Sequence, residues 1–370
     1  MASAEGGCDM KKTLSLALCL VLVLGAFSGC RQQTVDSGNR ITLNVYNWGQ
    51  YISDGSDDCL DVIAAFEEAY PNIKVNYSTY DSNEVMYTKL AGGGITVDVI
   101  IPSDYMIARM IDEGMLLELN FDNIPNYQYI DDNFKNTVYD PENKYSVPYA
   151  WGTVGILYNT KYVDEADLTG WDLLWNEKYE DKILMYDNSR DAFGIAQLML
   201  GYSLNTTDEE ELKACADLLA KQKPVVQQYV MDQIFELMEN EEAWIAPCYA
   251  GDYVTMADGN EDLAFYRPQE GFNLFIDAIC IPTCCQEKEA AELFINFLCE
   301  PEIAAGNMEW ICYSTPLKVE AVADFMDEET LADPNAYPSQ EELNRGTSFD
   351  SLPAAISRLM ESLFLKARIS

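Results

Sequence analysis

The sequence has 370 residues, of which 62 are acidic and 23 are basic, so the formal net charge is −39 at pH 7. A chain of this length predicts about two domains with a sizeable core, and so negative a field argues against nucleic acid as a partner and attracts cations. The 11 Cys come without any His, which argues against a zinc site and removes the commonest general base of enzymes. We therefore expect no metal, no cofactor and no catalytic residues.

The start of the chain has the order of a bacterial export signal. Two lysines in Met10–Lys12 precede an apolar run over Leu14–Phe27, which is too short to span a bilayer comfortably, and Gly29 then precedes Cys30. This order resembles a bacterial lipobox, in which the Cys becomes the lipid-carrying N-terminus. A single membrane-anchoring helix is the alternative, but the shortness of the run and the position of Cys30 favour lipidation.

These features predict how the protein is processed and where it acts. Residues 1–29 are predicted to be a signal peptide, with Met10 as a candidate true start, and residues 30–40 to be a polar, lipidated tether. The mature protein is then extracytoplasmic and anchored to the cell membrane through Cys30. The Cys beyond the leader form no C-x-x-C pair, and we expect most of them to be free thiols that pack as small hydrophobic residues.

After the tether, strand-like and helix-like segments alternate. Their apolar residues recur at every second position in strands and at helical spacing in helices, and the run 97–103 is apolar enough for a strand buried on both faces. The predicted order is a strand over 41–45, a helix over 56–70, a strand over 73–80, a helix over 83–93, the strand over 97–103 and a helix over 105–114. This order indicates a mostly parallel sheet covered by helices.

A second series of elements follows a long extended stretch over 145–159. Its strand candidates span 182–187, 224–229, 243–249 and 273–282, and its helical segments span 190–201, 208–222, 231–243, 287–310 and 351–368. No internal repeat or low-complexity linker separates the two series. A two-lobed α/β protein whose chain crosses between the lobes more than once would have this order.

Aromatic residues and carboxylates recur together where these strands end. Ligands of open α/β sheets bind outside the carboxyl ends of the strands, so residues at these positions are candidates for one cleft. They are Tyr46, Trp48, Tyr51, Ser103, Tyr105, Asp187, Asn188, Asp191, Tyr249, Asp252, Phe275 and Asp277. An aromatic face attracts a cation and a carboxylate accepts its N–H donors, so the pairing suits ammonium groups, although sugar sites also use stacked aromatics.

Each candidate also has a purely structural interpretation. Trp48 could complete the core, but its place beside a Gly and a Gln favours a site. Asp187 most simply acts at a helix start, and for Asp191 this interpretation and a ligand role are about equal. Asp277 lies in an apolar strand, where a charge needs a partner, and no Lys or Arg occurs over 271–283. This absence favours a cation that comes from outside the protein.

Six segments together resemble a known family. They are LNVYNWGQYIS (43–53), YSTYDSNEVMYTKL (77–90), DVIIPSDYMIARMIDEGML (98–116), YSVPYAWGT (145–153), LGYSLNTTD (200–208) and STP (314–316). In this order, over nearly the whole mature chain, they look like the spermidine/putrescine-binding lipoproteins of ABC importers, which are periplasmic-binding-protein-like, type II. The resemblance implies a two-lobed α/β fold, each lobe a mostly parallel sheet flanked by helices, with a ligand cleft between the lobes.

The resemblance also implies a domain division, a ligand and partners. Lobe 1 would comprise 41–148 plus 277–321, and lobe 2 would comprise 149–276 plus 322–370. The cleft would close on a polyamine, spermidine or putrescine, and the permease and ATPase complex of an ABC importer would recognise the closed form. We expect a monomer that binds a solute and is not an enzyme.

Matching the family's motif residue by residue assigns the ligand-binding positions. Asn188 and Asp191 would surround one terminal ammonium, and Asp277 would bind an amine. Tyr249 and Phe275 would be facing aromatic walls. The full set is Trp48, Gln50, Tyr51, Ser103, Tyr105, Asn188, Asp191, Tyr249, Asp252, Phe275, Asp277 and Tyr313.

Several positions depart from the family's pattern. Gly49 replaces a hydroxyl or larger residue, Asn188 stands where an Asp is usual, and Met231 stands where Ser is frequent. Tyr249 and Phe275 replace wall residues that are often Trp. The departures leave the preferred polyamine open. A binding protein of the same fold for a sugar, a quaternary amine or a peptide stays an alternative, and an acid-dependent glycosidase ranks far below both.

Overall fold

The structure, a computed structural model, describes residues 40–369. The predicted signal peptide (1–29), the predicted lipidation site Cys30 and the predicted tether up to residue 39 lie outside the described residues. Among the helices of residues 40–369, none is both long and apolar enough to cross a membrane.

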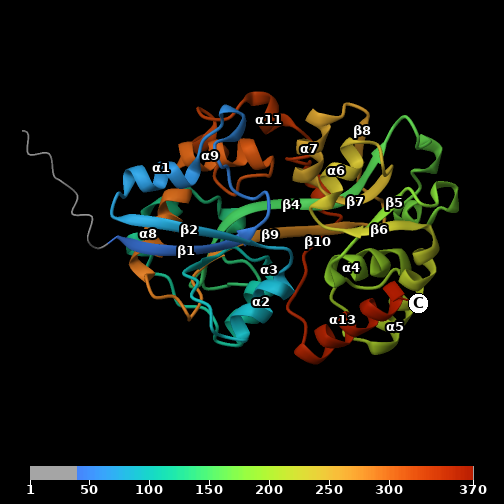
Figure 1. Ribbon diagram of the computed structural model, residues 1–370, viewed down its shortest axis with the longest axis horizontal. Coiled ribbons are helices and arrows are strands. Elements are labelled where there is room, and N and C mark those ends of the chain that lie inside the picture. Colours follow the sequence, from blue (N-terminus) through green and yellow to red (C-terminus); the bar gives the residue numbers. More distant parts are fainter. Residues whose placement is uncertain (1–39, 370) are drawn as a thin grey trace, which may run out of the picture. The chain divides into compact units, whose positions relative to one another are not determined.

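Three parallel strands form the first part of the sheet (Figure 1), in the alternating β-α order that the sequence predicts. We call this part lobe 1. Its strands are β1 (Ile41–Trp48), β2 (Ile73–Tyr80) and β3 (Val99–Ile100), and its helices are α1 (Val62–Ala69), α2 (Asn83–Ala91), α3 (Asp104–Asp112), α8 (Lys288–Leu298) and α9 (Pro301–Ile311).

Alternation along β1 builds an apolar layer on each face of this sheet. Leu43 and Val45 belong to the same buried cluster as Phe66 of α1, whereas Tyr46 packs with Met86 of α2 and its neighbours. Burying one such aliphatic or aromatic side chain contributes about 1.5–3 kcal/mol. Helices therefore cover both faces, and the carboxyl ends of the strands are the part of the sheet left for a ligand.

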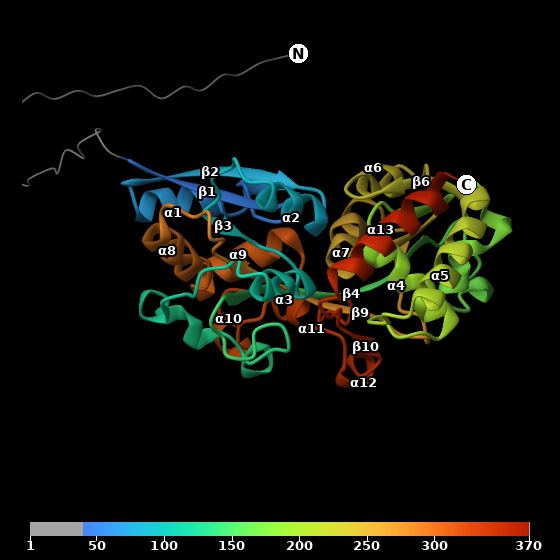
Figure 2. The same cartoon turned by 90° about the horizontal axis from the view of Figure 1, so that it is seen from below.

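Two long antiparallel strands carry the sheet from one lobe to the other. β4 (Ser146–Asn159) pairs with β9 (Phe272–Cys280), with Ser146 opposite Cys280 and Thr153 opposite Leu274. β9 also pairs with β3, and β4 pairs with β7, so the sheet is continuous in the order β2-β1-β3-β9-β4-β7-β5-β6. Figure 2 shows β4 and β9 running between the two groups of helices. The parallel strand sets of the two lobes are thus parts of one mixed sheet.

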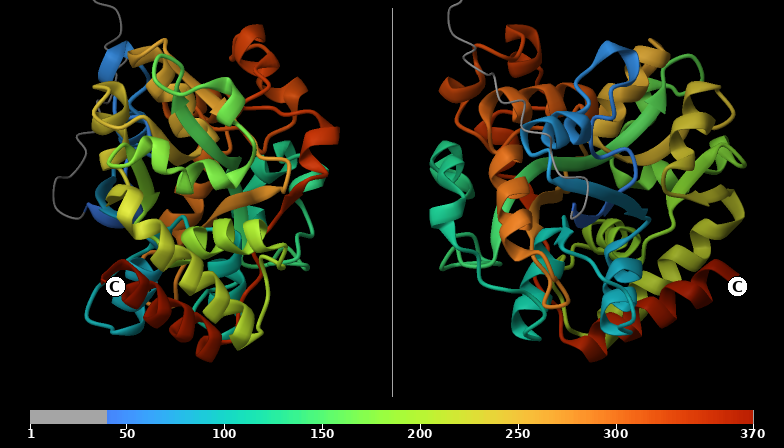
Figure 3. Two further views of the ribbon diagram at one scale, coloured as in Figure 1. Left: turned by 90° about the vertical axis from the view of Figure 1, so that its right-hand side faces the viewer. Right: turned by 60° about the vertical axis from the view of Figure 1, so that its left-hand side comes forward.

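Lobe 2 repeats the parallel arrangement, with β5 between β6 and β7. Figures 1 and 3 show helices on both sides of these strands, with α4, α5 and α13 packed together on one side. Its elements are β5 (Ile183–Tyr186), β6 (Val226–Val230), β7 (Ile245–Tyr249), β8 (Leu263–Tyr266), α4 (Ser189–Leu200), α5 (Glu209–Gln222), α6 (Gln233–Glu239), α7 (Ala250–Gly259) and α13 (Ala354–Ile369).

Short elements complete the described chain. β10 (Gly346–Thr347) adds a parallel strand beside β9. The others are α10 (Val319–Val322), α11 (Glu328–Ala332), α12 (Gln340–Leu343) and 3-10 turns over Ser56–Asp58, Phe121–Asn123, Pro125–Tyr129, Asp132–Phe134, Glu165–Asp167, Trp171–Trp175, Glu177–Tyr179 and Lys223–Val225.

Two predicted helices differ from the structure in ways that local chemistry explains. The segment 56–70 starts as a 3-10 turn, and α1 begins only at Val62, because the carboxylate of Asp61 accepts a hydrogen bond from the Ala64 N–H at 2.8 Å and caps the helix there. The segment 287–310 forms α8 and α9 with a break before Pro301, since proline cannot continue a helical hydrogen-bond ladder but suits a first turn. Helix α7 was not predicted from the sequence.

The cysteines of the interior pack as small apolar residues. Cys215, Cys248, Cys280 and Cys299 are buried free thiols. Burial raises the pKa of each of these thiols above its ordinary value. This agrees with the interpretation of the cysteines as core residues.

Candidate functional site

A cleft lies where loops of both lobes meet over β9. It contains about 710 Å³ of space between protein atoms, part of which is open solvent. Every ligand-binding residue predicted above lies in its lining. The lining also includes residues that were not predicted: Gly49, Asn83, Asp104, Met231, Asp232, Phe235, Asn273 and Phe349.

The loop after β1 is held rigidly against lobe 1. Tyr149 donates its hydroxyl hydrogen to the Tyr51 carbonyl at 2.6 Å, and the Trp48 indole N–H donates to the Ile101 carbonyl at 2.9 Å. The Trp48 ring lies 4.8 Å from the Tyr80 ring between centroids. Gln50 has φ 50, in the left-handed region, so the chain turns sharply here and presents the loop to the cleft.

Asp277 is the carboxylate that β9 contributes to the cleft. It is 5% exposed, and its Oδ2 accepts a hydrogen bond from the Tyr51 hydroxyl at 2.7 Å. Its Oδ1 is buried and accepts no hydrogen bond from any residue in 40–369. Burial raises the pKa of Asp277 to about 6, whereas the neighbouring hydroxyl groups of Ser103 and Tyr51 lower it. An acceptor with an unused lone pair therefore faces this part of the cleft.

Ser103 stands at the start of α3 without capping it. Its side chain makes no capping hydrogen bond to the helix, and its backbone forms a bridge with Asp277. Its side chain therefore does not act as a helix cap. Its neighbour Asp104 accepts a hydrogen bond from the Tyr105 N–H at 2.7 Å, and burial together with the charge of Asp277 raises the pKa of Asp104.

Asp191 and Asn188 form a second acidic position at the first turn of α4. Asn188 caps the helix by accepting hydrogen bonds from the Arg190 and Asp191 N–H groups. Its amide also donates to Asp191 Oδ2 at 2.6 Å, and the Tyr249 hydroxyl donates to the same oxygen at 2.8 Å. Burial raises the pKa of Asp191 to about 7, whereas the Tyr249 hydrogen bond lowers it. The buried carboxylate is thus oriented but only partly compensated.

Asp252 provides a third acidic position at the start of α7. Its Oδ1 accepts a hydrogen bond from the Tyr313 hydroxyl at 2.6 Å. Burial raises the pKa of Asp252 to about 7, the Tyr313 hydrogen bond lowers it, and the charge of Asp232 raises it further. In each of the three acids, one tyrosine hydroxyl orients the carboxylate, so the same design recurs at Asp277, Asp191 and Asp252.

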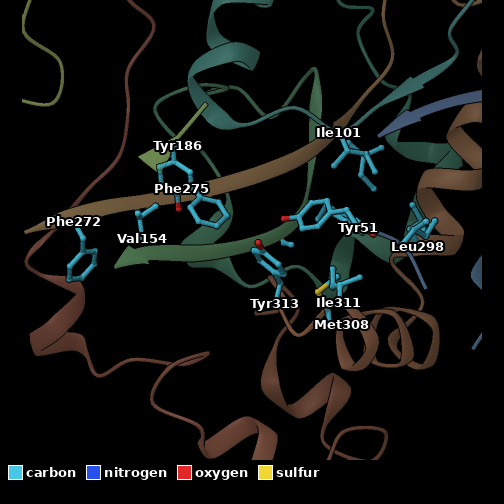
Figure 4. Close-up of a cluster of buried hydrophobic side chains, with 14 of the residues drawn as sticks. Tyr51, Ile101, Val154, Tyr186, Phe272, Phe275, Leu298, Met308, Ile311 and Tyr313 are labelled. Atoms are coloured by element: carbon cyan, nitrogen blue, oxygen red, sulfur yellow. The ribbon is translucent and has the colours of Figure 1, made fainter. Parts of the chain in front are cut away.

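Aromatic rings line the space between these acids. Ring centroids are 5.5 Å apart for Tyr249 and Phe275, 6.2 Å for Phe275 and Tyr313, and 5.0 Å for Tyr313 and Tyr51, each pair edge to face. Figure 4 shows Phe275, Tyr51 and Tyr313 gathered around one space beside β9. Gly152 lies opposite Phe275 on β4, and a Cβ there would lie 2.8 Å from the ring, so glycine leaves room for this wall.

No Lys or Arg of residues 40–369 lines the cleft. Arg190 lies behind it, with its guanidinium carbon 4.2 Å from the Phe349 ring centroid and 5.6 Å from that of Tyr105. Asp187, by contrast, does not line the cleft and forms an ion pair with Arg368, so its role is structural, although Asn188 and not Asp187 caps α4. The cleft therefore concentrates negative charge, which Arg190 offsets only in part by lowering the pKa values of Asp191 and Asp104.

Comparison with known proteins places this geometry in a family. The family described as bacterial extracellular solute-binding protein matches residues 61–336. The chain belongs to this family. Solved relatives share its α/β fold, and the sheet of that fold is, in this chain, the mixed sheet described above.

Individual relatives cover most of the chain. The spermidine/putrescine-binding periplasmic protein of Salmonella typhimurium is 33% identical over 306 residues, which cover 82% of this chain and 85% of that protein. The solved spermidine/putrescine ABC transporter substrate-binding protein PotD from Streptococcus pneumoniae is 36% identical, with a TM-score of 0.72, and covers 89% of this chain and 99% of that chain. The Tp0655 (TpPotD) lipoprotein of Treponema pallidum is 27% identical, with a TM-score of 0.77, and covers 89% and 100%.

The cleft residues of this solute-binding protein that were not predicted have weak or ambiguous signals in the sequence, each for its own reason. Asp104 follows Ser103 at a helix start and reads as a capping residue. Asp232 falls inside the predicted helix 231–243, although it follows the strand β6 by two residues and so could have been listed with the other strand-end candidates. Asn273 could have been found, because it lies two residues before Phe275 in a strand and so shares its face. Phe349 comes from a C-terminal segment that only the tertiary structure brings to the cleft.

Proposed function

We propose that this chain is an extracytoplasmic solute-binding protein that binds a linear polyamine, spermidine or putrescine, and delivers it to an ABC importer. The observation that carries the proposal is the set of tyrosine-oriented carboxylates at Asp277 and Asp191, which are buried, and Asp252, which is half-buried, in a cleft whose described lining includes no cationic side chain. The names of the relatives given above point to the same ligand class.

The arrangement suits a chain of methylenes that ends in ammonium groups. A carboxylate receives ammonium N–H donors as charge-assisted hydrogen bonds, and the unused Oδ1 of Asp277 is one such acceptor. The faces of Phe275 and Tyr249 cover the methylenes, and each cation–π contact contributes about 0.5–2 kcal/mol. Before the ligand binds, the protein holds these acceptors oriented and without a cationic side chain to pair with in the cleft.

Ligand binding would favour the closed arrangement of the two lobes, because acceptors from both lobes contact one cation. We place lobe 1 at 41–148 plus 277–321 and lobe 2 at 149–276 plus 322–370. β4 and β9 pair with each other as they run between the lobes, with Ser146 opposite Cys280 and Thr153 opposite Leu274, which supports a boundary within these strands. The permease and ATPase complex then recognises the closed monomer, and the proposal includes no catalytic step.

Calorimetry and thermal shift test the ligand class. We expect putrescine, cadaverine and spermidine to bind, whereas maltose and glycine betaine do not. At a ligand concentration of 100 times Kd, the stabilisation should be about 2.7 kcal/mol. Stabilisation by maltose or glycine betaine without any response to polyamines would instead assign the cleft to another solute.

The proposal includes a lipid anchor at Cys30. The order of charge, apolar run and Cys supports it, as does the description of the Treponema relative as a lipoprotein. In a bacterial host, wild-type protein should fractionate with the membrane, and Cys30→Ser should appear in the soluble extracytoplasmic fraction. Recovery of the Cys30→Ser protein in the membrane fraction at the wild-type level would contradict the anchor.

A further inference from the structure

Asn273 is a buried amide that the chain leaves without a partner. It is 7% exposed and lines the cleft, and its Oδ1 accepts no hydrogen bond from residues 40–369. Several buried amides of residues 40–369 have an atom without a hydrogen-bond partner, but among all such residues only Asn273 and Asp277 line the cleft. Buried polar groups in proteins nearly always have partners, so an unpartnered amide in the cleft lining points to a partner that the chain does not supply.

The position of Asn273 on β9 gives the distance at which that partner would bind. Asn273, Phe275 and Asp277 alternate along one strand and share one face. Four residues of strand span about 13 Å. Phe275, the aromatic wall, lies midway, so a ligand held by Asp277 reaches Asn273 only by passing over that ring.

Ligand length then separates two classes of polyamine. From ordinary bond lengths, the end nitrogens of an extended diamine with four methylenes are about 6 Å apart, and those of a triamine with three and four methylenes are about 11 Å apart. A diamine bound at Asp277 ends near Phe275. A triamine bound there brings its distal ammonium to the amide of Asn273.

An amide suits this end of the cleft because acidic groups are already present. Asp191 and Asn188 stand at the first turn of α4, which packs on β9. A carbonyl oxygen accepts an ammonium N–H without adding another buried charge. Rotation about the Cβ–Cγ bond can turn that oxygen towards the cleft. The backbone of Asn273 is paired with β10, opposite Thr347, so only the side chain is available to a ligand.

We propose that Asn273 is a specificity-determining residue that accepts the distal ammonium of a linear triamine and so favours triamines over diamines. The inference rests on the proposed polyamine function and narrows its ligand class. Asn273→Leu, which has a similar volume and no hydrogen-bonding group, should weaken spermidine binding by about tenfold or more and leave putrescine binding within about twofold.

Calorimetry with spermidine and putrescine provides the test, with Asn76→Leu as the matched control. Asn76 is an exposed asparagine on β2, outside the cleft, and its substitution should change neither affinity. Asn273→Asp should strengthen spermidine binding relative to putrescine, and it serves as a second variant if Asn273→Leu does not fold, as judged by circular dichroism. Equal weakening of both ligands, or of neither, by Asn273→Leu would overturn the inference and leave the polyamine function intact. Failure of the wild type to bind either amine would overturn both.

Discussion

Asp277, Asp191 and Asp252 illustrate how single residues prepare a site for a cation. Burial raises the pKa of these acids to about 6, 7 and 7, so the ligand-free protein holds them in an unfavourable environment. Each tyrosine partner offsets part of that cost by donating one hydrogen bond. A bound ammonium offsets the remaining cost. The burial of these carboxylates therefore both destabilises the empty cleft and favours ligand binding.

Asp277→Asn should weaken polyamine binding by well over tenfold. The substitution removes the charge and one acceptor lone pair, and breaking a desolvated ion pair costs about 3–5 kcal/mol. Calorimetric titration with spermidine measures the effect, with Asp187→Asn as the control, because Asp187 pairs with Arg368 and does not line the cleft. Unchanged affinity in Asp277→Asn would show that our assignment of this residue is wrong.

The raised pKa values predict opposite pH trends for binding and stability. Each acid holds its proton more strongly in the folded state, so its contribution to ligand-free stability is full below about pH 4 and is lost as the pH rises towards about 7. Polyamine affinity should rise over pH 5–8, because binding requires ionised carboxylates while amines stay protonated. Titrations at pH 6.5 in buffers of different ionisation enthalpy should reveal proton release, and its absence would contradict the raised pKa values.

The loop after β1 in lobe 1 approaches the start of α6 in lobe 2. A Cβ on Gly49 would overlap Asp232 Oδ2, so glycine permits this approach. Asp232 is exposed to solvent in part, yet burial and the charge of Asp81 raise its pKa, as expected for a carboxylate at the cleft mouth. Gly49, which departs from the family's pattern, therefore lies opposite an acidic residue of the other lobe, Asp232.

Gly49→Leu should weaken polyamine binding by about tenfold without lowering the melting temperature of the ligand-free protein. The added side chain obstructs only the approach of the lobes, and the loop itself has room in an open form. Asp232→Ala should suppress the effect, so a double-mutant cycle measured by calorimetry should show strong coupling between the two positions. Additive effects of the two substitutions would show that Gly49→Leu does not act through contact with Asp232.

At the scale of the whole described unit, one mixed sheet connects two lobes through β4 and β9. By the division proposed above, the chain crosses between the lobes in β4, in β9 and again at 321–322, and so few crossings permit hinge closure. Cleft residues from both lobes are buried in the arrangement described. The net charge of −39 over the full sequence also attracts polycations before contact.

Small-angle scattering should detect closure directly. We expect the radius of gyration of the mature protein to decrease when spermidine is added in excess, because the cation draws acceptors of both lobes together. Asp277→Asn should show no decrease at the same ligand concentration. An unchanged radius in the wild type, despite calorimetric saturation, would mean that binding does not require closure.

The sequence by itself determined the order of the elements, because hydrophobic periodicity is local and alternating strands and helices leave few arrangements. Periodicity and turn position also indicated the acids and aromatics after each strand, and the family resemblance added Gln50 and Tyr313 to them. Only the tertiary structure decided that β4 and β9 pair with each other and join the lobes in one sheet, that α7 begins at the cleft, and that Asp104 and Phe349 line it. Whether a side chain is buried, and whether it has a hydrogen-bond partner, depends on residues distant in sequence. A local sequence pattern therefore predicts neither property.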